Sequence, residues 1–246
     1  MTASASGPSR SEAAEGALGL YPFLAAGGER DLASVMAEVR RSSAEKAEEI
    51  VELRCLLMAE CGDRLAACAE AMAQHFAVGG RLFTFGNGGS STDAAGLATA
   101  FLNPLRGRPL PALCLTGDSA VLTALSNDVS FEVVFARQIA ALGRPGDIAL
   151  GLSTSGGSAN VGAGLEAAAQ RGMLTVAMAG YSGGRLGELD CLDHLFAVPS
   201  ASVHRIQEAQ TTLYHVLWEL VTRALEEISG PAAGTAAGTD GPGGRP

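Results

Sequence analysis

Apolar residues change their spacing along the chain near residue 80. From about Arg30 to Phe76 they recur every three or four positions, as on one face of an α-helix. Gly62 and Asp63 predict a break between two helices in this section. After Gly80, short apolar runs alternate with helical patterns. The chain therefore divides into a helical N-terminal section and a longer section of alternating strands and helices.

Five apolar runs in the longer section have the length and composition of buried strands. The predicted strands are Arg81–Phe85, Leu110–Leu115, Asp147–Leu152, Leu174–Ala179 and His194–Val198. The predicted helices are Asp93–Phe101, Ala120–Leu125, Phe131–Leu142, Ala159–Arg171 and Val203–Ile228, with a short helical piece at Gly183–Leu189. Apolar strands that alternate with helices indicate a parallel sheet covered on both faces. We predict an α/β fold: a flavodoxin-like three-layer α/β/α sandwich with a five-stranded parallel sheet and N-terminal helices.

The two ends of the chain differ in composition from the rest. Residues 1–16 are small and polar, and residues 230–246 are rich in Gly, Pro, Ala and Thr, which is typical of disordered tails. Residues 17–229 are predicted to form a single domain that includes the helical section. The chain has 246 residues, 47% of them hydrophobic, which is enough for one sizeable core.

Charge and cysteine content narrow the class of protein. The formal net charge of −9 argues against a broad nucleic-acid or anionic-membrane surface, although backbone N–H groups can still hold a phosphate locally. The five cysteines are odd in number and widely spaced, which fits a reducing compartment. The N-terminus lacks the pattern of a signal peptide, and no apolar run reaches transmembrane length. We therefore expect a cytoplasmic protein.

Two segments rich in glycine and hydroxyl groups each follow a predicted strand and open a helix. The first, GNGGSST, spans residues 86–92, and the second, STSGGS, spans residues 153–158. Glycines let a ligand approach the backbone, and N–H groups and hydroxyls at a helix start can bind phosphate oxygens. Neither segment has the Lys of a Walker A loop or the GxGxxG spacing of a dinucleotide site. Either alone also fits an ordinary capped turn, but together they predict one phosphate site at the carboxyl edge of the sheet.

These motifs resemble those of the sugar isomerase (SIS) domain family, in particular its phosphoheptose isomerase branch. The resemblance is carried by GNGGSS, LTGDSAVLTALSND, STSGGSANV and RIQEAQTTLYH, and it extends over about residues 81–223. It implies a phosphosugar isomerase of carbohydrate metabolism that converts sedoheptulose 7-phosphate to D-glycero-D-manno-heptose 7-phosphate, through an enediolate, in heptose biosynthesis. It also implies a homotetramer with sites at subunit junctions.

The resemblance also implies roles for individual residues. The phosphate would be held by Ser153, Thr154, Ser155 and Ser158. The sugar site would be lined by Asn87, Gly88, Gly89, Ser90 and Asp118. Gln207 and His215, on the last helix, match a catalytic pair that can also bind zinc in the family. Zinc is therefore the one cofactor that the resemblance suggests.

Two further positions differ from the family pattern. In phosphoheptose isomerases the helix after the first loop carries a His and, one turn later, a Glu, whereas this chain has Gly96 and Ala100 there. Half of the expected metal site and the expected acid/base carboxylate are therefore missing. A neighbouring subunit could supply the carboxylate. The candidates for that role are Glu60, Glu70 and Glu132.

An aldose–ketose isomerase needs a base near the carbon and a group that stabilises the enediolate oxygen. His204, Glu208 and His215 fall near one face of the last predicted helix. We hypothesise that His215 or His204 is the base, with Glu208 orienting it or acting itself. In the alternative interpretation, His204 and Glu208 cap the helix or form ion pairs at a subunit interface.

Three functions stay open at this point. The phosphate loops and the pair Gln207 and His215 favour a phosphosugar isomerase. Gly96 and Ala100 favour a non-catalytic SIS tetramer that binds a phosphosugar or a protein partner. The third interpretation is a phosphosugar sensor or an isomerase for another sugar, although the sequence lacks a DNA-binding helix-turn-helix segment.

Overall fold

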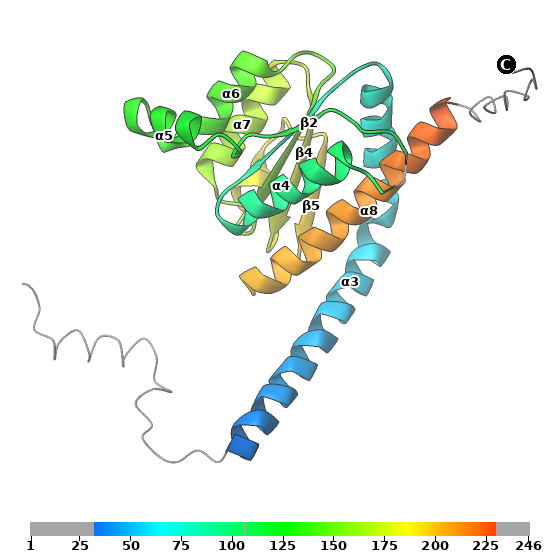
Figure 1. Cartoon of the computed structure of the whole chain (residues 1–246), viewed down its shortest axis with the longest axis vertical. Coiled ribbons are helices and arrows are strands. Elements are labelled where there is room, and N and C mark those ends of the chain that lie inside the picture. The colour runs from blue at the N-terminus through cyan, green and yellow to red at the C-terminus, as the bar shows by residue number, and fades with distance from the viewer. Residues whose placement is uncertain (1–31, 106, 230–246) are drawn as a thin grey trace, which may run out of the picture. The chain divides into compact units, whose positions relative to one another are not determined.

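The computed structural model describes residues 32–105 and 107–229 (Figure 1). The predicted tails, residues 1–16 and 230–246, lie outside these ranges. The chain divides into two compact units, Met1–Glu48 and Glu49–Pro246. This boundary falls inside the predicted domain of residues 17–229, and the assignment of that domain stays a prediction. The sheet and the candidate site belong to the second unit.

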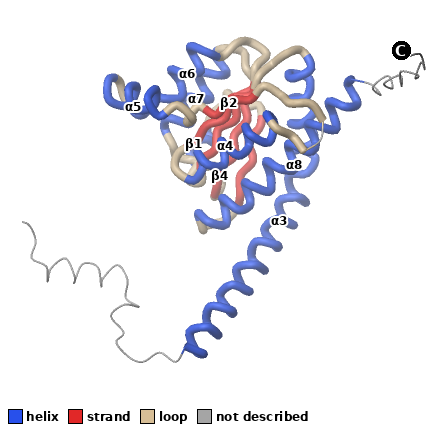
Figure 2. The backbone as a smooth tube through the Cα atoms, in the orientation of Figure 1, coloured by secondary structure: helices blue, strands red, loops and turns tan. Residues whose placement is uncertain are grey.

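The predicted α/β fold and its five strands are confirmed. The strands are β1 (Leu82–Gly86), β2 (Ala112–Cys114), β3 (Ile148–Ser153), β4 (Leu174–Gly180) and β5 (His194–Val198). They form one parallel sheet in the order β2-β1-β3-β4-β5, which Figure 2 shows in red. Every residue of β1, β3 and β4 is buried, as expected of strands covered on both faces.

The helices also follow the predicted order. They are α3 (Leu32–Ala77), α4 (Gly89–Leu102), α5 (Ser119–Asp128), α6 (Val134–Leu142), α7 (Ala159–Gln170) and α8 (Val203–Ser229), with short 3-10 helices η1 (Phe131–Val133) and η2 (Gly184–Glu188). No helix in the described part of the chain is both long enough and apolar enough to cross a membrane.

The predicted break at Gly62 and Asp63 is wrong, because α3 runs without interruption for 46 residues. A Cβ atom added to Gly62 would have no neighbour within 4 Å, so this glycine makes no turn or close approach. Cys61, Leu65 and Cys68 of the same helix are buried. A glycine inside a helix costs only about 1 kcal/mol relative to alanine, and burial of this apolar stripe outweighs that cost.

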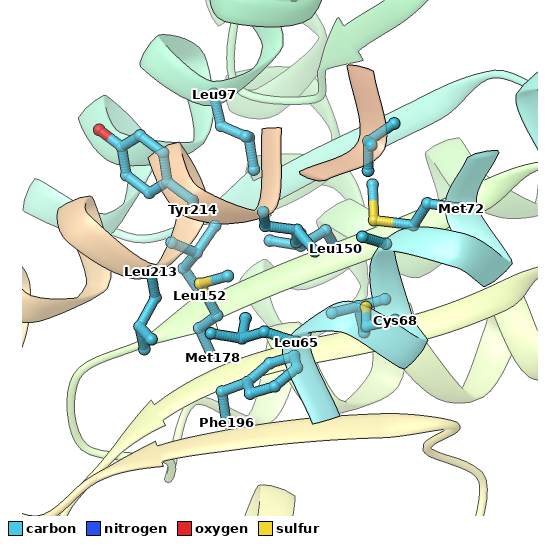
Figure 3. Packing of buried hydrophobic residues seen from close by; sticks show 14 of the residues in the cluster. Leu65, Cys68, Met72, Leu97, Leu150, Leu152, Met178, Phe196, Leu213 and Tyr214 are labelled. Atoms are coloured by element: carbon cyan, nitrogen blue, oxygen red, sulfur yellow. The ribbon is translucent and has the colours of Figure 1, made fainter. Parts of the chain in front are cut away.

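Each face of the sheet has its own apolar core. On one face, Leu65 of α3 and Leu213 of α8 pack in the same cluster as Leu150 of β3, together with residues of α4 (Figure 3). On the other face, Phe85 of β1 lies 5.1 Å from Phe135 of α6, measured between ring centroids, and α7 adds to this second cluster. The fold is therefore a three-layer sandwich.

Asp147, just before β3, joins the start of β3 to the start of β1. Its carboxylate accepts hydrogen bonds from the backbone N–H of Arg81 at 2.9 Å and from the Nη2 of Arg81 at 2.6 Å. The backbone N–H of Arg144 also donates to it at 2.9 Å. Burial favours the neutral acid, but the hydrogen bonds from Arg81 and Arg144 outweigh burial, and the pKa of Asp147 lies below its ordinary value.

The face of the sheet that the following helix covers changes between β1 and β3. The helix after β1, α4, packs with α3 and α8 on one face, whereas α7, the helix after β3, contributes to the core of the other face. In doubly wound sheets, ligands bind outside the carboxyl ends of the strands at this change of face. Gly86 pairs with Leu152 in the sheet, so the two loops begin side by side.

Candidate functional site

The first loop turns tightly from β1 into α4. A Cβ atom on Gly86 would lie 2.8 Å from the Cβ of Ser90 and 2.9 Å from the carbonyl oxygen of Leu152, so only glycine fits. Gly88, the residue before the helix, has a φ of 54°, which also favours glycine. Because α4 begins at Gly89, earlier than predicted, its first turn comes from the loop itself. The N–H groups of Ser90, Ser91 and Thr92 already donate to carbonyl oxygens of the loop. The positive end of the α4 dipole can therefore attract an anion, but these N–H groups are not free to bind it. Ser90, predicted to line the sugar site, is buried with 4% of its surface exposed.

The second loop gathers three hydroxyl groups directly after β3. The Oγ of Ser153 lies 3.0 Å from the Oγ of Ser158 and 3.5 Å from the Oγ of Ser155. The backbone N–H of Gly157 donates to Ser155 at 3.1 Å. Hydroxyls can turn to donate to an anion, so three of the four predicted phosphate ligands are brought together. The fourth, Thr154, is half-buried in the same turn.

A third loop, which follows β4, interlocks with the second. Gly156 has a φ of 64°, and a Cβ atom there would lie 2.1 Å from the carbonyl oxygen of Gly183. A Cβ atom on Gly180 would lie 2.1 Å from the carbonyl oxygen of Thr154 and 2.5 Å from the Cδ1 of Ile206 in α8. Glycines at these positions therefore let the second loop, the third loop and the start of α8 pack together. No role was predicted for this third loop from the sequence.

The first two loops are joined by a reciprocal pair of amides. The Nδ2 of Asn87 donates to the Oδ1 of Asn160 at 2.8 Å, and the Nδ2 of Asn160 donates to the Oδ1 of Asn87 at 2.9 Å. Asn160 lies in the first turn of α7 and is 3% exposed. Asn87 was predicted to line the sugar site, but each polar atom of its side chain already has a partner within the protein.

Gln207, in the first turns of α8, lies against the first loop. A Cβ atom on Gly89 would lie 1.9 Å from the Nε2 of Gln207 and 3.2 Å from its Oε1. The absence of a side chain at Gly89 therefore makes room for the amide. This contact brings together two predicted site residues, although 118 residues separate them in the sequence.

Asp93 lies beside Gln207 between α4 and α8. The hydroxyl of Thr211 donates to the Oδ1 of Asp93 at 3.4 Å, while the Oδ2 of Asp93 is buried and has no hydrogen-bond partner within the described part of the protein. Burial raises the pKa of Asp93 above its ordinary value, and the hydrogen bond from Thr211 and the nearby amide of Gln207 lower it by less. Asp93 is thus a carboxylate next to a predicted site residue, and sequence reasoning missed it.

Gly96, at the position of the family's His, faces a tyrosine. A Cβ atom on Gly96 would lie 3.5 Å from the hydroxyl oxygen of Tyr214 in α8, which is 5% exposed. The pKa of Tyr214 lies above its ordinary value. Burial and the negative charge of Asp93 raise it, and the hydrogen bond with Thr211 lowers it by less. His215 is exposed and meets the Tyr214 ring edge-on, with 4.8 Å between ring centroids. A tyrosine therefore occupies the space beside Gly96.

The other residues of the hypothesised base group lie apart from His215. Glu208 forms an ion pair with Arg205, which also pairs with Glu49 of α3 at 3.3 Å. His204 is exposed in the first turn of α8, about 16 Å along the helix axis from His215. The ion-pair partner of Glu208 lies in the same chain, so both interpretations of His204 and Glu208, as a base group or as capping and interface residues, stay predictions.

Asp118 caps α5 and borders a different cavity. Its carboxylate accepts hydrogen bonds from the backbone N–H groups of Ala120 and Val121, both at 3.0 Å. With Leu113 and Leu142, Asp118 lines a mostly apolar cavity of about 830 Å³. The described lining of this cavity includes no residue of the first or second loop. The structure therefore gives Asp118 a capping role, and its predicted contact with the sugar stays a prediction.

The residues of this one chain do not fit a zinc site. Residues 32–105 and 107–229 contain no group of three or more His, Cys, Asp or Glu side chains that could hold a metal ion. Gln207 and His215 lie about two turns apart on α8, and Gly96 and Ala100 add no ligand. A zinc ion takes three or four protein ligands, so the two predicted zinc ligands do not complete a site within a single chain.

Sequence reasoning missed Asn160, Asp93 and Tyr214 for different reasons. Asn160 stands in the quoted SGGSAN segment, but its partner is 73 residues away, and only the fold reveals the pair. Asp93 follows the first loop directly and could have been noticed as the acidic residue of that helix. Tyr214 stands in the quoted RIQEAQTTLYH segment, but its contact with Gly96 joins residues far apart in sequence, and only the fold reveals it.

Comparisons with known proteins agree with the fold and the loops. The SIS domain model matches residues 47–180. A phosphoheptose isomerase of Roseiflexus sp. (strain RS-1) is 48% identical over 165 residues, which cover 66% of this chain and 83% of that protein. A solved phosphoheptose isomerase from Neisseria gonorrhoeae has 34% identity and a TM-score of 0.70, covering 74% of this chain and 98% of its own. One from Francisella tularensis has 31% identity and a TM-score of 0.71, covering 75% and 98%.

Proposed function

The chain belongs to the SIS domain family, and on that premise we propose that it is an aldose–ketose isomerase that acts on sedoheptulose 7-phosphate. The product would be D-glycero-D-manno-heptose 7-phosphate. Similarity to phosphoheptose isomerases over most of the length of those relatives supports this substrate. The geometry of the two loops supports the part of the proposal that concerns the phosphate.

The phosphate binds at the carboxyl ends of β1 and β3. Ser153, Ser155 and Ser158 donate their hydroxyl protons to its oxygens, and the positive end of the α4 dipole adds a favourable electrostatic contribution. The single observation that carries this proposal is the cluster of hydroxyls around Ser153, within 3.5 Å of it. Neutral donors of this kind hold a phosphate without a cation, which suits an acidic chain.

The isomerisation moves one proton between two carbons of the sugar. A base removes a proton from C1 of the ketose, and the electrons of that C–H bond form the enediolate with negative charge on the C2 oxygen. Return of a proton to C2, with transfer of the O1 proton to O2, completes the aldose. His215 acts as the base, and the Gln207 amide at Gly89 stabilises the enediolate oxygen.

The test is a proton NMR assay of the purified chain with sedoheptulose 7-phosphate in heavy water. An isomerase incorporates deuterium at the carbon that exchanges its proton, and a new heptose signal appears. His215→Ala should slow this exchange at least about 100-fold, the usual contribution of a general base. Glu219→Ala, an exposed change one turn further along α8, serves as the matched control. Full turnover by His215→Ala would remove His215 from the mechanism.

A second candidate function is binding without turnover. Tyr214 occupies the space beside Gly96, and Ala100 supplies no carboxylate, which favours a chain that kept the phosphate loops and lost the chemistry. In that case the sugar shifts the melting temperature but no deuterium is incorporated. Ala100→Glu, compared with the isosteric Ala100→Gln, separates the two functions. If only the carboxylate is missing, the Glu variant gains about 100-fold or more in exchange and the Gln variant gains nothing.

We propose that the protein works as a homotetramer in the cytoplasm. Exposed apolar side chains on α3, Val51 and Leu56, and on α8, Val203 and Ile228, support contacts between subunits through these helices. Light scattering on a sizing column measures the mass directly. A monomer at micromolar concentration would contradict the tetramer and would remove the option that a neighbouring subunit supplies a carboxylate.

A further inference from the structure

Asn87 and Asn160 form a closed pair at the centre of the candidate site. Each side chain donates one hydrogen bond to the other and accepts one in return, at 2.8 and 2.9 Å. Asn160 is 3% exposed, so its amide depends on a partner inside the protein. A pair in which each amide both donates and accepts fixes the orientation of both side chains.

The two asparagines lie at the start of the first loop and just after the end of the second loop. Asn87 lies between Gly86, the last residue of β1, and Gly88, which precedes α4 and has a positive φ. Asn160 lies two residues after Ser158, whose hydroxyl contacts Ser153. The pair therefore bridges the two loops at the point where the sheet changes face, between segments that are 73 residues apart in sequence.

We propose that Asn160 is a positioning residue that holds the first loop, through Asn87, in register with the hydroxyls of the second loop. Asn87 then serves the site through its backbone and its bond to Asn160, and its side chain does not bind the sugar. The inference rests on the proposed function, because it takes the hydroxyl cluster to be the phosphate site. It adds a residue to which neither the family pattern nor the loop motif assigned a role.

The consequence is a coupling between the two loops. With Asn160 shortened, the first loop loses its fixed position beside the serine hydroxyls and must be ordered again when the ligand binds. Each residue whose backbone has to be fixed on binding costs about 10-fold in affinity. We therefore expect Asn160→Ala to weaken phosphate binding by about 10-fold to 100-fold, although Asn160 itself does not touch the ligand.

The test is a double-mutant cycle on the full chain. Asn87→Ala, Asn160→Ala and the double variant are compared by calorimetry for their affinity toward inorganic phosphate and toward sedoheptulose 7-phosphate. Because both residues act through one pair, each single change should weaken binding of both probes, and the double variant should be no weaker than the worse single variant. Asn103→Ala is the matched control, since Asn103 is exposed and lies at the end of α4 away from the first loop.

The possible results separate the inference from the proposed function. If Asn87 contacted the sugar directly, Asn87→Ala would weaken sugar binding while Asn160→Ala left it intact, and the inference would be overturned. Lower melting temperatures with unchanged affinities, measured well below unfolding, would overturn it as well. A wild-type chain that binds neither probe would refute the proposed function and the inference with it. If Asn160→Ala fails to fold, the affinity of Asn87→Ala for inorganic phosphate still tests the inference. Inorganic phosphate has no sugar for Asn87 to contact, so weaker binding by this variant requires that the first loop has moved. Unchanged binding would overturn the inference.

Discussion

Replacing Gly89 with alanine tests the contact on which the candidate site depends most closely. The new Cβ atom would lie 1.9 Å from the Nε2 of Gln207, whereas ordinary contact begins at 3.4 Å. The amide must therefore move by about 1.5 Å to reach a normal contact distance. Because the atom that must move is the end of a flexible side chain, the fold can accommodate the change while the site cannot.

The size of the effect follows from that displacement. A shift of about 1 Å in a positioned group costs about 100-fold in rate, or about 2.7 kcal/mol of transition-state stabilisation. Stability should change little, because alanine favours the helix over glycine by up to about 1 kcal/mol and offsets part of the strain. We therefore expect a chain that unfolds at nearly the wild-type urea midpoint and has about 100-fold lower kcat/KM.

The assay combines urea unfolding with deuterium exchange on sedoheptulose 7-phosphate, or with sugar affinity if the chain only binds. Gly62→Ala is the matched control, because no atom lies within 4 Å of its added Cβ atom. That variant should gain about 0.5–1 kcal/mol in stability with unchanged turnover. Wild-type turnover and affinity in Gly89→Ala would show that the Gln207 amide has no role in the site.

Three further predictions concern buried groups. Asp147→Asn should lower the free energy of unfolding by about 1–2 kcal/mol, because the buried side chain loses charge-assisted hydrogen bonds, while the Arg81 side chain is 33% exposed and water can solvate its charge. The pKa of Asp147 is lowered on folding. The wild type should therefore be more stable than Asp147→Asn at neutral pH, and this difference in stability should vanish as pH falls below about 4. The pKa of Asp93 is raised on folding, so the charged form costs stability, and Asp93→Asn should gain on the wild type as pH rises above about 4. Gly180→Ala should cost more than about 2 kcal/mol, because its Cβ atom would strike the rigid backbone at Thr154.

Urea titrations at several pH values measure the two acid predictions together. A stability gap between wild type and Asp147→Asn that stays constant down to about pH 2 would show that Asp147 keeps no special pKa in the fold. If Asp93→Asn were less stable than the wild type at neutral pH, the Asp93 carboxylate would have to be stabilised by a hydrogen-bond donor in the folded protein, which would contradict the prediction. For Gly180→Ala, an unchanged urea midpoint would refute the close packing of the second and third loops.

The sheet was predictable because its strands are apolar throughout and are separated by helices. A strand buried on both faces needs no register information to be recognised, and all five were found close to their true ends. The ends of helices next to polar loops were harder to predict. The serines and threonine after Gly89 look like a loop, yet they form the first turn of α4, where hydroxyl side chains are common.

The candidate site was predictable only in part. The two loops are local in sequence, and the sheet brings their hydroxyls and glycines to one edge. Which side chains meet across that edge depends on how strands far apart in sequence line up. The bond between Asn87 and Asn160 and the contact of Gln207 with Gly89 are of this kind. The break in α3 was predicted wrongly because glycine is common where helices end, and the sequence pattern does not show how well the residues around Gly62 pack.

The candidate site draws on the ends of β1, β3 and β4 and on the first turns of α4, α7 and α8. No short stretch of the chain contains it, so a ligand that binds there binds only the folded unit. By mass action, each tenfold rise in ligand concentration above the dissociation constant adds about 1.4 kcal/mol to the stability of that unit. A cell in which the phosphosugar accumulates would therefore keep more of this protein folded and shielded from proteases, and the substrate would regulate the lifetime of the protein that handles it.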